Sequence, residues 1–395
     1  MKVGIFSGSR ADFWLQRSVY QSCLKQFDLD PVYILGNELG CGANEAIFQT
    51  LNFDKAKYKI IKNKDASTGK LAPFLVSESM LRELNNIEGL GDLDCLVVLG
   101  DRYETLLIVF WFVLHRIPVF HIHGGEKTLG SLDDRFRHAI TKLADVHFTS
   151  ESAYANRILQ LGEDPKNVHV VGSIGQDLAL QQASFDLCHL EQILGVKLEG
   201  GFAMVTFHPE TTAVDQGSCH LRPVMNWMMT HSSLLLLVSK PNNDPGSEEI
   251  ESYFKSLAVS YPERILLLES LSQETYFSLL KESQYIVGNS SSNIIEAPVF
   301  QRPILNIGRR QEGRICSQFV VNYCFNSNDD DVSSTFERLD EIGRIFKFQD
   351  DSIRLKNKNR PSELIAKKIS GYLASEDLNK IEKVFFDIEV ASIDC

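Results

Sequence analysis

Short apolar runs alternate with amphipathic stretches along the first half of this chain. The apolar runs lie at 3–7, 31–35, 96–99, 119–122, 146–149 and 169–171, and the amphipathic stretches at 13–27, 75–87, 105–114 and 133–143. Continuous apolar runs are typical of parallel strands that are buried on both faces. The alternation of strand and helix predicts a parallel sheet with right-handed crossovers.

The pattern loosens after Gly172 and restarts at Gly200 and Gly201. Residues 173–200 are predicted to form a linker and a short helix, and further strands are expected at 202–207, 234–238, 265–268, 285–287 and 303–307. We therefore predict an α/β protein with two Rossmann-like, doubly wound domains that face a central cleft, spanning 1–175 and 176–360. Ligands of such sheets bind at the carboxyl ends of the strands, where the unusual polar clusters of this chain fall.

The length, net charge and cysteine pattern of the chain exclude several classes of protein. A chain of 395 residues is too long for one compact core, which agrees with two domains. The formal net charge of −12 argues against a general affinity for nucleic acid or an anionic membrane. The 8 cysteines include no C-x-x-C, and the opening MKVGIFSGSR has no apolar signal region, so we expect a cytoplasmic protein with reduced thiols. The longest apolar run, 106–114, is too short for a membrane span.

Two polar clusters follow strands in the first half. The stretch SGSRADF, 7–13, could bring backbone N–H groups and Arg10 to an anion, or it could be a tight turn with a helix cap. The stretch GDRYE, 100–104, places Asp101 and Arg102 at a strand end, either in a site or as a cap and surface ion pair. The absence of G-x-G-x-x-G argues against a nicotinamide dinucleotide.

A third cluster, HIHGGEKTLGSLDDRFRH at 121–138, is rich in titratable groups. On a strand, His121 and His123 would share a face, and H-x-H with a nearby glutamate can bind a divalent ion. The carboxylates at Glu126, Asp133 and Asp134 fit acid–base catalysis better. We therefore predict acid–base chemistry with no metal and no cofactor.

The second half carries an expected anion site in GNSSSNIIEA, 288–297. After the strand, small residues and serines lead into a helix expected to begin near Asn293, and Glu296 could accept hydrogen bonds from a diol such as ribose. The alternative is a serine N-cap with Glu296 in an ordinary capping interaction. The flanking stretches FHPETT (207–212), PNNDPGSEE (241–249) and NIGRRQEGR (306–314) also follow strands.

Taken together, GSRAD, GDRYE, HIHGGE…DD..RHAITKLA, FHPETT, PNNDPGS and GNSSS…E resemble the hydrolysing UDP-N-acetylglucosamine 2-epimerases of sialic and related nonulosonic acid biosynthesis. The motifs lie in family order across roughly residues 1–315. The related non-hydrolysing enzymes tend to read HVEAG and GNSGG at the third and sixth clusters, where this chain has His123 and Ser291–Ser292. The resemblance implies the GT-B type of fold, with a C-terminal helix from about 360–395 completing the first domain.

The resemblance also implies roles for individual residues. The residues expected at UDP are Arg10, Arg102, His208, Asn242, Ser290, Ser291, Glu296 (ribose) and Arg310 (near uracil). The expected acid–base groups are Asp101, Glu126, Asp133 and Asp134, with His123 at a position where some members carry a catalytic glutamate. Which of these groups abstracts the proton stays open.

The implied reaction is elimination of UDP from a UDP-2-acetamido sugar, giving a 2-acetamidoglucal to which water adds. The expected substrate is UDP-GlcNAc and the products are ManNAc and UDP. One alternative is the same reaction on UDP-N,N'-diacetylbacillosamine, and another is a UDP-sugar-dependent GT-B glycosyltransferase. A pure nucleotide-sugar binding role is a third reading. Family resemblance also implies a homo-oligomer, either a dimer or a tetramer.

Overall fold

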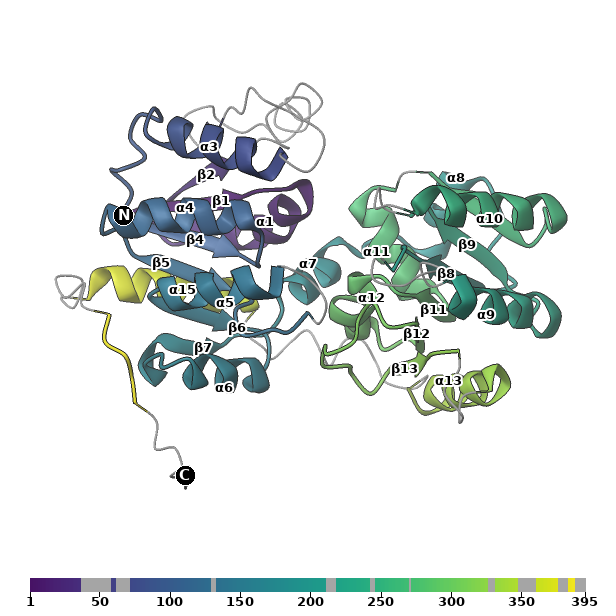
Figure 1. Cartoon of the computed structure of the whole chain (residues 1–395). Helices are drawn as coiled ribbons and strands as arrows, with labels where there is room; N and C mark the ends of the chain where they lie inside the picture. The colour runs from purple at the N-terminus through teal and green to yellow at the C-terminus, as the bar shows by residue number, and fades with distance from the viewer. Residues whose placement is uncertain are drawn as a thin grey trace. The chain divides into compact units, whose positions relative to one another are not determined.

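The computed structural model describes residues 1–36, 58–61, 72–128, 133–210, 218–241, 246–269, 271–325, 331–346, 360–375 and 383–387. The chain divides into two compact units. Unit 1 comprises Met1–Lys127, Ser131–Ile174 and Asn359–Cys395, and unit 2 comprises Thr128–Gly130 and Gly175–Lys358. Both are α/β units built on parallel sheets, as the alternation of apolar and amphipathic stretches predicted (Figure 1).

The sheet of unit 1 has the strand order β3-β2-β1-β4-β5-β6-β7, and every pairing is parallel. The order reverses between β1 and β4, which is the point where ligands of doubly wound sheets bind. The strands are β1 (Lys2–Ser7), β2 (Asp30–Leu35), β3 (Tyr58–Ile60), β4 (Cys95–Leu99), β5 (Val119–Ile122), β6 (Val146–Thr149) and β7 (Val168–Val170). The helices are α1 (Arg10–Leu24), α3 (Ala72–Leu84), α4 (Tyr103–Leu114), α5 (Asp133–Leu143), α6 (Ser152–Gln160), the short η3 (Pro165–Asn167) and α15 (Pro361–Ala374).

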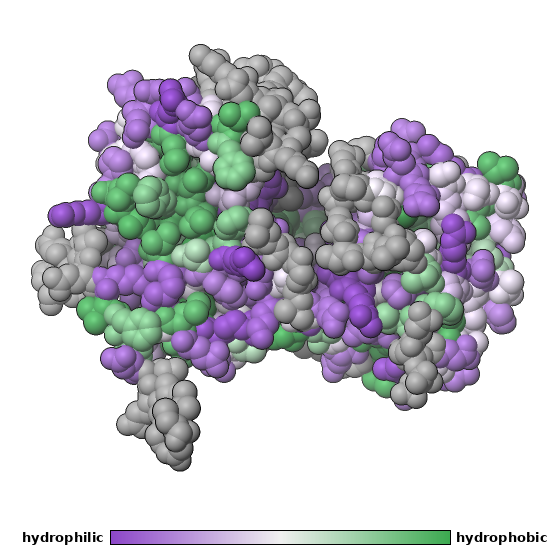
Figure 2. Space-filling view, in the orientation of Figure 1, coloured by the Kyte–Doolittle hydropathy of each residue, from purple (hydrophilic) through white to green (hydrophobic). Residues whose placement is uncertain are grey.

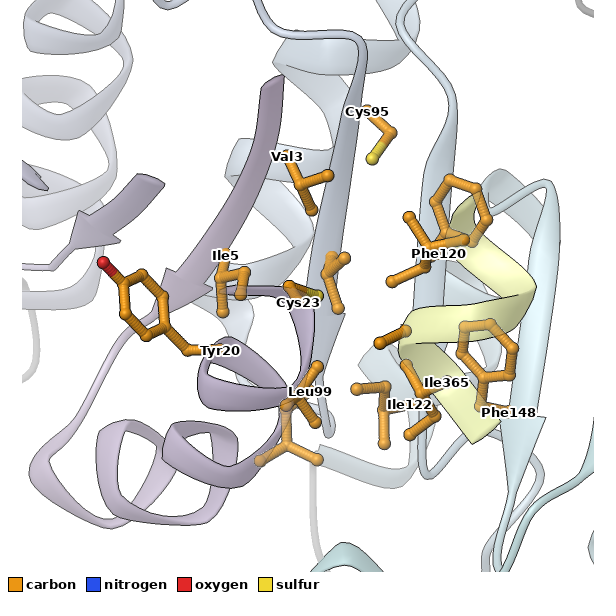
Figure 3. Close-up of a cluster of buried hydrophobic side chains, with 14 of the residues drawn as sticks. Val3, Ile5, Tyr20, Cys23, Cys95, Leu99, Phe120, Ile122, Phe148 and Ile365 are labelled. Carbon is orange, nitrogen blue, oxygen red and sulfur yellow. The ribbon is translucent and has the colours of Figure 1, made fainter. Parts of the chain in front are cut away.

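Helices cover both faces of this sheet. Side chains of α1 and α15 pack on one face and side chains of α3, α4 and α5 on the other. Figure 3 shows Ile365 of α15 beside Phe120, Ile122 and Phe148 of the central strands. Because α15 buries its apolar stripe against the sheet and α1, this helix belongs to the core of unit 1.

The sheet of unit 2 has the order β10-β9-β8-β11-β12-β13 and is also parallel throughout. The strands are β8 (Phe202–Thr206), β9 (Leu235–Ser239), β10 (Ile265–Leu268), β11 (Tyr285–Gly288), β12 (Ile304–Ile307) and β13 (Val320–Tyr323). The helices are α7 (Ile174–Gln182), α8 (Leu187–Leu194), α9 (Ser218–His231), α10 (Ser247–Ser260), α11 (Gln273–Glu282), α12 (Ser291–Ile295), η4 (Ala297–Phe300) and α13 (Val332–Phe346).

Three details differ from the sequence-based expectations. Residues 173–200 contain two helices, α7 and α8, where a linker and one short helix were predicted. Strands β3 and β13 were not predicted. Helix α12 begins at Ser291 and not near Asn293, because Ser290 caps it. Among the helices in the described ranges, none has the length and apolar character that crossing a bilayer requires.

Candidate functional site

The turn from β4 to α4 presents Asp101 and Arg102 at the carboxyl edge of the first sheet. Gly100 has a left-handed φ of 80°, and its N–H donates to the Ile122 carbonyl of β5 at 3.1 Å. Arg102 is the N-cap residue of α4, and its guanidinium pairs with Glu104 at 3.1 Å. The main-chain bond between the two strand ends brings Asp101 to the same edge as the residues that follow β5.

His123 lies just beyond β5 in a conformation that is unusual for a residue with a side chain. Its φ is 63°, and the strand ends at Ile122. Its Nδ1 lies 2.7 Å from Glu126 Oε1, and its Nε2 has no hydrogen-bond partner among the described residues. Left-handed backbone at a non-glycine residue costs free energy and is concentrated at functional sites. The contact with Glu126 orients the His123 imidazole, and its Nε2 stays available to a ligand.

His121 has a different environment, which contradicts the expectation that the two histidines share a face. Its side chain is buried, with Nε2 2.8 Å from the Gly100 carbonyl and Nδ1 3.2 Å from Thr141 Oγ1. Burial lowers the pKa of His121 to about 3, so the ring is neutral. Since a carbonyl can only accept, Nε2 carries the proton. The Thr141 hydroxyl beside Nδ1 also donates to the Arg137 carbonyl at 3.0 Å. Both ring nitrogens are used, and no metal-ligating pair forms here.

Arg137 of α5 connects the acidic residues of this edge. Its side chain is 2% exposed. It donates to Asp101 Oδ2, to Asp134 Oδ1 at 3.1 Å and to the Glu126 carbonyl at 3.1 Å. The structure thus brings Asp101, Asp134 and the His123–Glu126 pair together around one guanidinium. Arg137 had no predicted role, although its position three residues after Asp134 on a helix was a usable signal.

The remaining candidates of unit 1 are less informative. Asp133 is the first residue of α5 and is half-buried. The backbone of Arg10 begins α1, but its side chain is outside the described residues. The Ser9 side chain accepts from Asp12 N–H and Asp12 accepts from Ser9 N–H, which is a capping box. Burial raises the pKa of Asp12. The stretch therefore contains a helix cap, and the role of Arg10 at an anion stays a prediction.

In unit 2, Asn289 organises the carboxyl ends of three strands. Its side chain is fully buried, accepts from His208 N–H at 2.7 Å and donates to the His208 carbonyl at 2.8 Å. Its own carbonyl accepts from Arg310 at 3.2 Å and from Gln311 at 2.8 Å. His208, Ser290 and Arg310 are thereby held at one edge. Asn289 stood in the GNSSS motif but had no predicted role.

The serine stretch starts a very short helix. Ser290 is the N-cap of α12, and its hydroxyl accepts from Ser292 N–H at 3.3 Å. Ser291 is exposed, whereas Ser290 is 8% exposed. Gly288 has a φ of 135°, and a Cβ there would lie 1.8 Å from the Thr206 carbonyl oxygen, so only glycine fits.

Glu296 lies at the C-terminal end of α12, not one and a half turns into a longer helix. It is 8% exposed, and a Cβ on Gly175 would lie 2.6 Å from its Oε1. Gln176 of the same helix start donates to the Ile295 carbonyl at 2.8 Å. Burial raises the pKa of the nearby Tyr276 to about 12, with the Glu296 charge adding to it. Glu296 is thus a buried carboxylate held against the start of α7.

Two further observations bear on ligands. Asn242 lies outside the described residues, as do residues 243–245 that follow it. Within the described part of the chain, no group of three or more His, Cys, Asp or Glu side chains could hold a metal ion.

Comparisons with known proteins point the same way as the motifs. A family model described as UDP-N-acetylglucosamine 2-epimerase matches residues 36–352. A Campylobacter jejuni protein named GDP/UDP-N,N'-diacetylbacillosamine 2-epimerase (hydrolyzing) is 30% identical over 86% of this chain and 87% of its own. An Escherichia coli protein named polysialic acid biosynthesis protein P7 is 32% identical, covering 83% of each chain.

Among solved structures, the Neisseria meningitidis UDP-GlcNAc 2-epimerase bound to UDP-GlcNAc matches with a TM-score of 0.67 at 14% identity, over 94% of this chain and 99% of that one. A likeness at this identity shows the fold, which is of the two-domain GT-B type. Both relatives named above are matched over more than four-fifths of their length.

Proposed function

We propose that this chain, which belongs to the UDP-N-acetylglucosamine 2-epimerase family, is a hydrolysing 2-epimerase that converts UDP-GlcNAc to ManNAc and UDP. The observation that carries the proposal is the cluster around Arg137. It combines a histidine oriented by Glu126 with two further carboxylates, Asp101 and Asp134. Elimination and hydration each need a proton to be moved at C2, and this cluster supplies both bases and acids.

In the first step, His123 removes the C2 proton. The Glu126 carboxylate holds Nδ1–H, which leaves the lone pair on Nε2, the ring nitrogen with no partner among the described residues. The C–H electron pair forms the C1–C2 double bond, and the C1–O bond breaks with UDP taking its electrons. The product of this step is a 2-acetamidoglucal.

In the second step, water adds across the double bond. Its oxygen bonds to C1 and its released proton passes to a carboxylate of the cluster, while a protonated carboxyl group delivers its proton to C2 from the face opposite the first abstraction. Asp101 is the proposed proton donor, with Asp134 beside it, and Asp133 belongs to the same set. Arg137 fixes the first two carboxylates, so they need no reorganisation during the reaction.

Unit 2 supplies the proposed UDP-binding groups. Ser290 and Ser291 contact the diphosphate, together with His208, while Glu296 accepts from the ribose hydroxyls and Arg310 lies near the uracil. The shared anchoring on Asn289 supports grouping His208, Ser290 and Arg310. Arg10, Arg102 and Asn242 complete the proposed set. Preorganised donors at a departing anion are each worth about 3–4 kcal/mol at the transition state.

A second substrate, UDP-N,N'-diacetylbacillosamine, is favoured by one specific observation. The Campylobacter jejuni relative, matched over 87% of its length, has this sugar in its name. The two substrates differ at C4 and C6 of the sugar, while the chemistry at C1 and C2 is the same.

The test is incubation of the protein with each nucleotide sugar separately, followed by NMR of the sugar product. Release of free ManNAc from UDP-GlcNAc supports the first substrate, and release of a free diacetamido sugar only from the other nucleotide supports the second. Formation of UDP-ManNAc instead of a free sugar would identify a non-hydrolysing enzyme. A product that requires an added acceptor would identify a glycosyltransferase.

We also propose that the protein is a cytoplasmic homo-oligomer. Helix α4 is apolar on nearly all sides, and Phe110 and Leu114 are 49% and 64% exposed on it. A helix that is apolar all round is normally buried, which supports cover by a second copy.

A further inference from the structure

A short extended segment near the C-terminus, residues 383–387, lies on unit 1 at the C-terminal end of α5. We call it the C-terminal strap. It contacts elements more than 200 positions earlier in the sequence, and the proposed reaction assigns it no role.

The ammonium of Lys383 is bonded to the last turn of α5. It donates to the carbonyls of Lys142 at 2.7 Å and Thr141 at 3.5 Å, and also to that of Ala144, just past the helix end. The final carbonyls of a helix have no partner within the helix, and a cation there also interacts favourably with the helix dipole. Lys383 is therefore a C-terminal cap supplied by a remote segment.

The buried carboxylate of Glu163 also holds the Lys383 ammonium in place. Glu163 is 3% exposed and lies 2.8 Å from Lys383, 2.7 Å from Lys142 and 3.0 Å from His147. Burial acts to raise the pKa of Glu163, but hydrogen bonds from these three partners lower it to about 2. The carboxylate is thus charged, and Lys383 shares it with a residue of α5 itself.

The docking position is also defined by shape. Gly162 has a φ of 77°, and a Cβ there would lie 2.3 Å from the ring of Phe385. Phe386 N–H donates to the Gly162 carbonyl at 2.9 Å, and the Lys142 ammonium lies 4.8 Å from the Phe385 ring centroid. A main-chain bond, a close ring approach and an ion pair together specify one register for the strap.

Helix α5 leads from the strap to the acid–base cluster. Thr141, whose carbonyl accepts from Lys383, contacts His121 through its hydroxyl. One turn earlier, Arg137 holds Asp101 and Asp134. We infer that Lys383 is a positioning residue for the reaction: by capping α5 it fixes the helix that carries Asp134 and Arg137. The kinetic part of this inference rests on the proposed function.

The test compares Lys383→Met, Lys383→Arg and, as a matched control in the same strap, Val384→Ala, whose side chain is 72% exposed. All are made in the full chain. Hydrogen exchange of the last turn of α5 reports the cap directly, without reference to catalysis. Steady-state kinetics with UDP-GlcNAc report positioning. Phe385→Ala loosens the strap but keeps the ion pair between Lys383 and Glu163. This variant replaces Lys383→Met if the latter does not fold.

For Lys383→Met we expect exchange in the last turn of α5 to be about fivefold faster, the scale of a lost cation at a helix end. We expect kcat to fall about threefold or more with KM changed less than about twofold, because the catalytic groups are displaced while UDP contacts are kept. Lys383→Arg should restore both, and Val384→Ala should change neither.

Unchanged exchange in both Lys383→Met and Phe385→Ala would show that the strap does not cap α5. Faster exchange with normal kcat would retain the cap and overturn the positioning role. If the parent protein has no activity on any UDP sugar, the proposed function fails, while the exchange measurement still decides whether Lys383 caps the helix.

Discussion

Arg137 allows two carboxylates and a carbonyl oxygen to lie close together in a partly buried place. Asp101 and Asp134 would repel one another without a cation between them, and the 2% exposed guanidinium offsets that repulsion with three directed hydrogen bonds. The planar fork also fixes where each oxygen points. A substitution at either carboxylate is therefore expected to alter chemistry more than folding.

For Asp101→Asn, we expect turnover of UDP-GlcNAc to fall about 100-fold or more, the scale of a lost acid–base group, with UDP affinity kept. The matched control is Asp94→Asn. Asp94 lies just before the opposite end of β4, where it accepts from Lys2 N–H at 2.6 Å, and turnover should be retained. Near-normal turnover in Asp101→Asn would reduce Asp101 to a structural partner of Arg137.

At this scale, residue types could be predicted from the sequence but their geometry could not. Asp101, Glu126, Asp134 and His123 were identified, and they do gather at one sheet edge, whereas a place for Asp133 in this group stays a prediction. The prediction that His121 and His123 share one face of a strand was wrong. Strand β5 ends at Ile122, so the alternation of side chains does not extend to His123. Only the structure reveals that His123 turns left-handed and that His121 bonds to Thr141.

At the scale of elements, α12 is the part of the chain whose role is most open to test. It has only five residues, and Ser290 is engaged as its cap. A contribution to UDP binding must therefore come from individual side chains, above all Ser291 and Glu296, and not from a long helix dipole.

We expect Ser291→Ala and Glu296→Ala to weaken UDP binding in calorimetric titrations, while the melting temperature of the unliganded protein changes little for Ser291→Ala. Ser290→Ala should weaken binding and also cost about 1 kcal/mol of stability, because it removes a cap as well. The capping alternative predicts a loss of stability for Ser290→Ala with UDP affinity like the parent in all three variants, and that result would remove this stretch from the UDP site.

Elements with continuous apolar runs were predictable, and elements defined by pairing were not. The bounds of β5, α5, β6 and β10 agree with the sequence pattern. Strand β3 was not predicted, because Tyr58–Ile60 includes a lysine and is extended through its pairing with β2. No strand-like run separates α7 from α8, so the sequence pattern predicted a linker with one short helix.

At the scale of the whole molecule, the net charge of −12 opposes binding of an anionic nucleotide sugar, so the affinity must come from local groups. The proposed diphosphate ligands are arginines, serines and His208, and both ring nitrogens of His121 lie against groups of the protein. This favours binding of the diphosphate without a bridging metal ion.

Protein treated with EDTA and desalted is therefore expected to keep its activity, measured as UDP release from UDP-GlcNAc. Added magnesium or zinc should produce no gain. A loss of activity that either ion restores would mean that a metal takes part in the reaction and that our assignment of the acid–base cluster is wrong.

Apolar surface gathers over α3 and α4 of unit 1 (Figure 2). Phe74, Leu75, Phe110 and Leu114 contribute to it, each more than 40% exposed. Apolar patches of this kind mark interaction sites in soluble proteins. This is the surface on which the proposed homo-oligomer depends.

We expect Phe110→Glu to lower the molar mass measured by light scattering after gel filtration, because a charge on α4 opposes burial against a second copy. Val259→Glu is the control, since Val259 is 83% exposed on α10 of unit 2. A parent that is monomeric, or a variant that keeps the parent's mass, would contradict assembly through this face.

The central claim is hydrolytic epimerisation through removal and return of a proton at C2. The most direct measurement is NMR of the products after incubation with UDP-GlcNAc in D2O. We predict free ManNAc carrying deuterium at C2, in equal amount to UDP, because the abstracted proton exchanges with solvent before a solvent-derived deuteron is delivered. Free GlcNAc, or ManNAc with its original hydrogen at C2, would contradict the account.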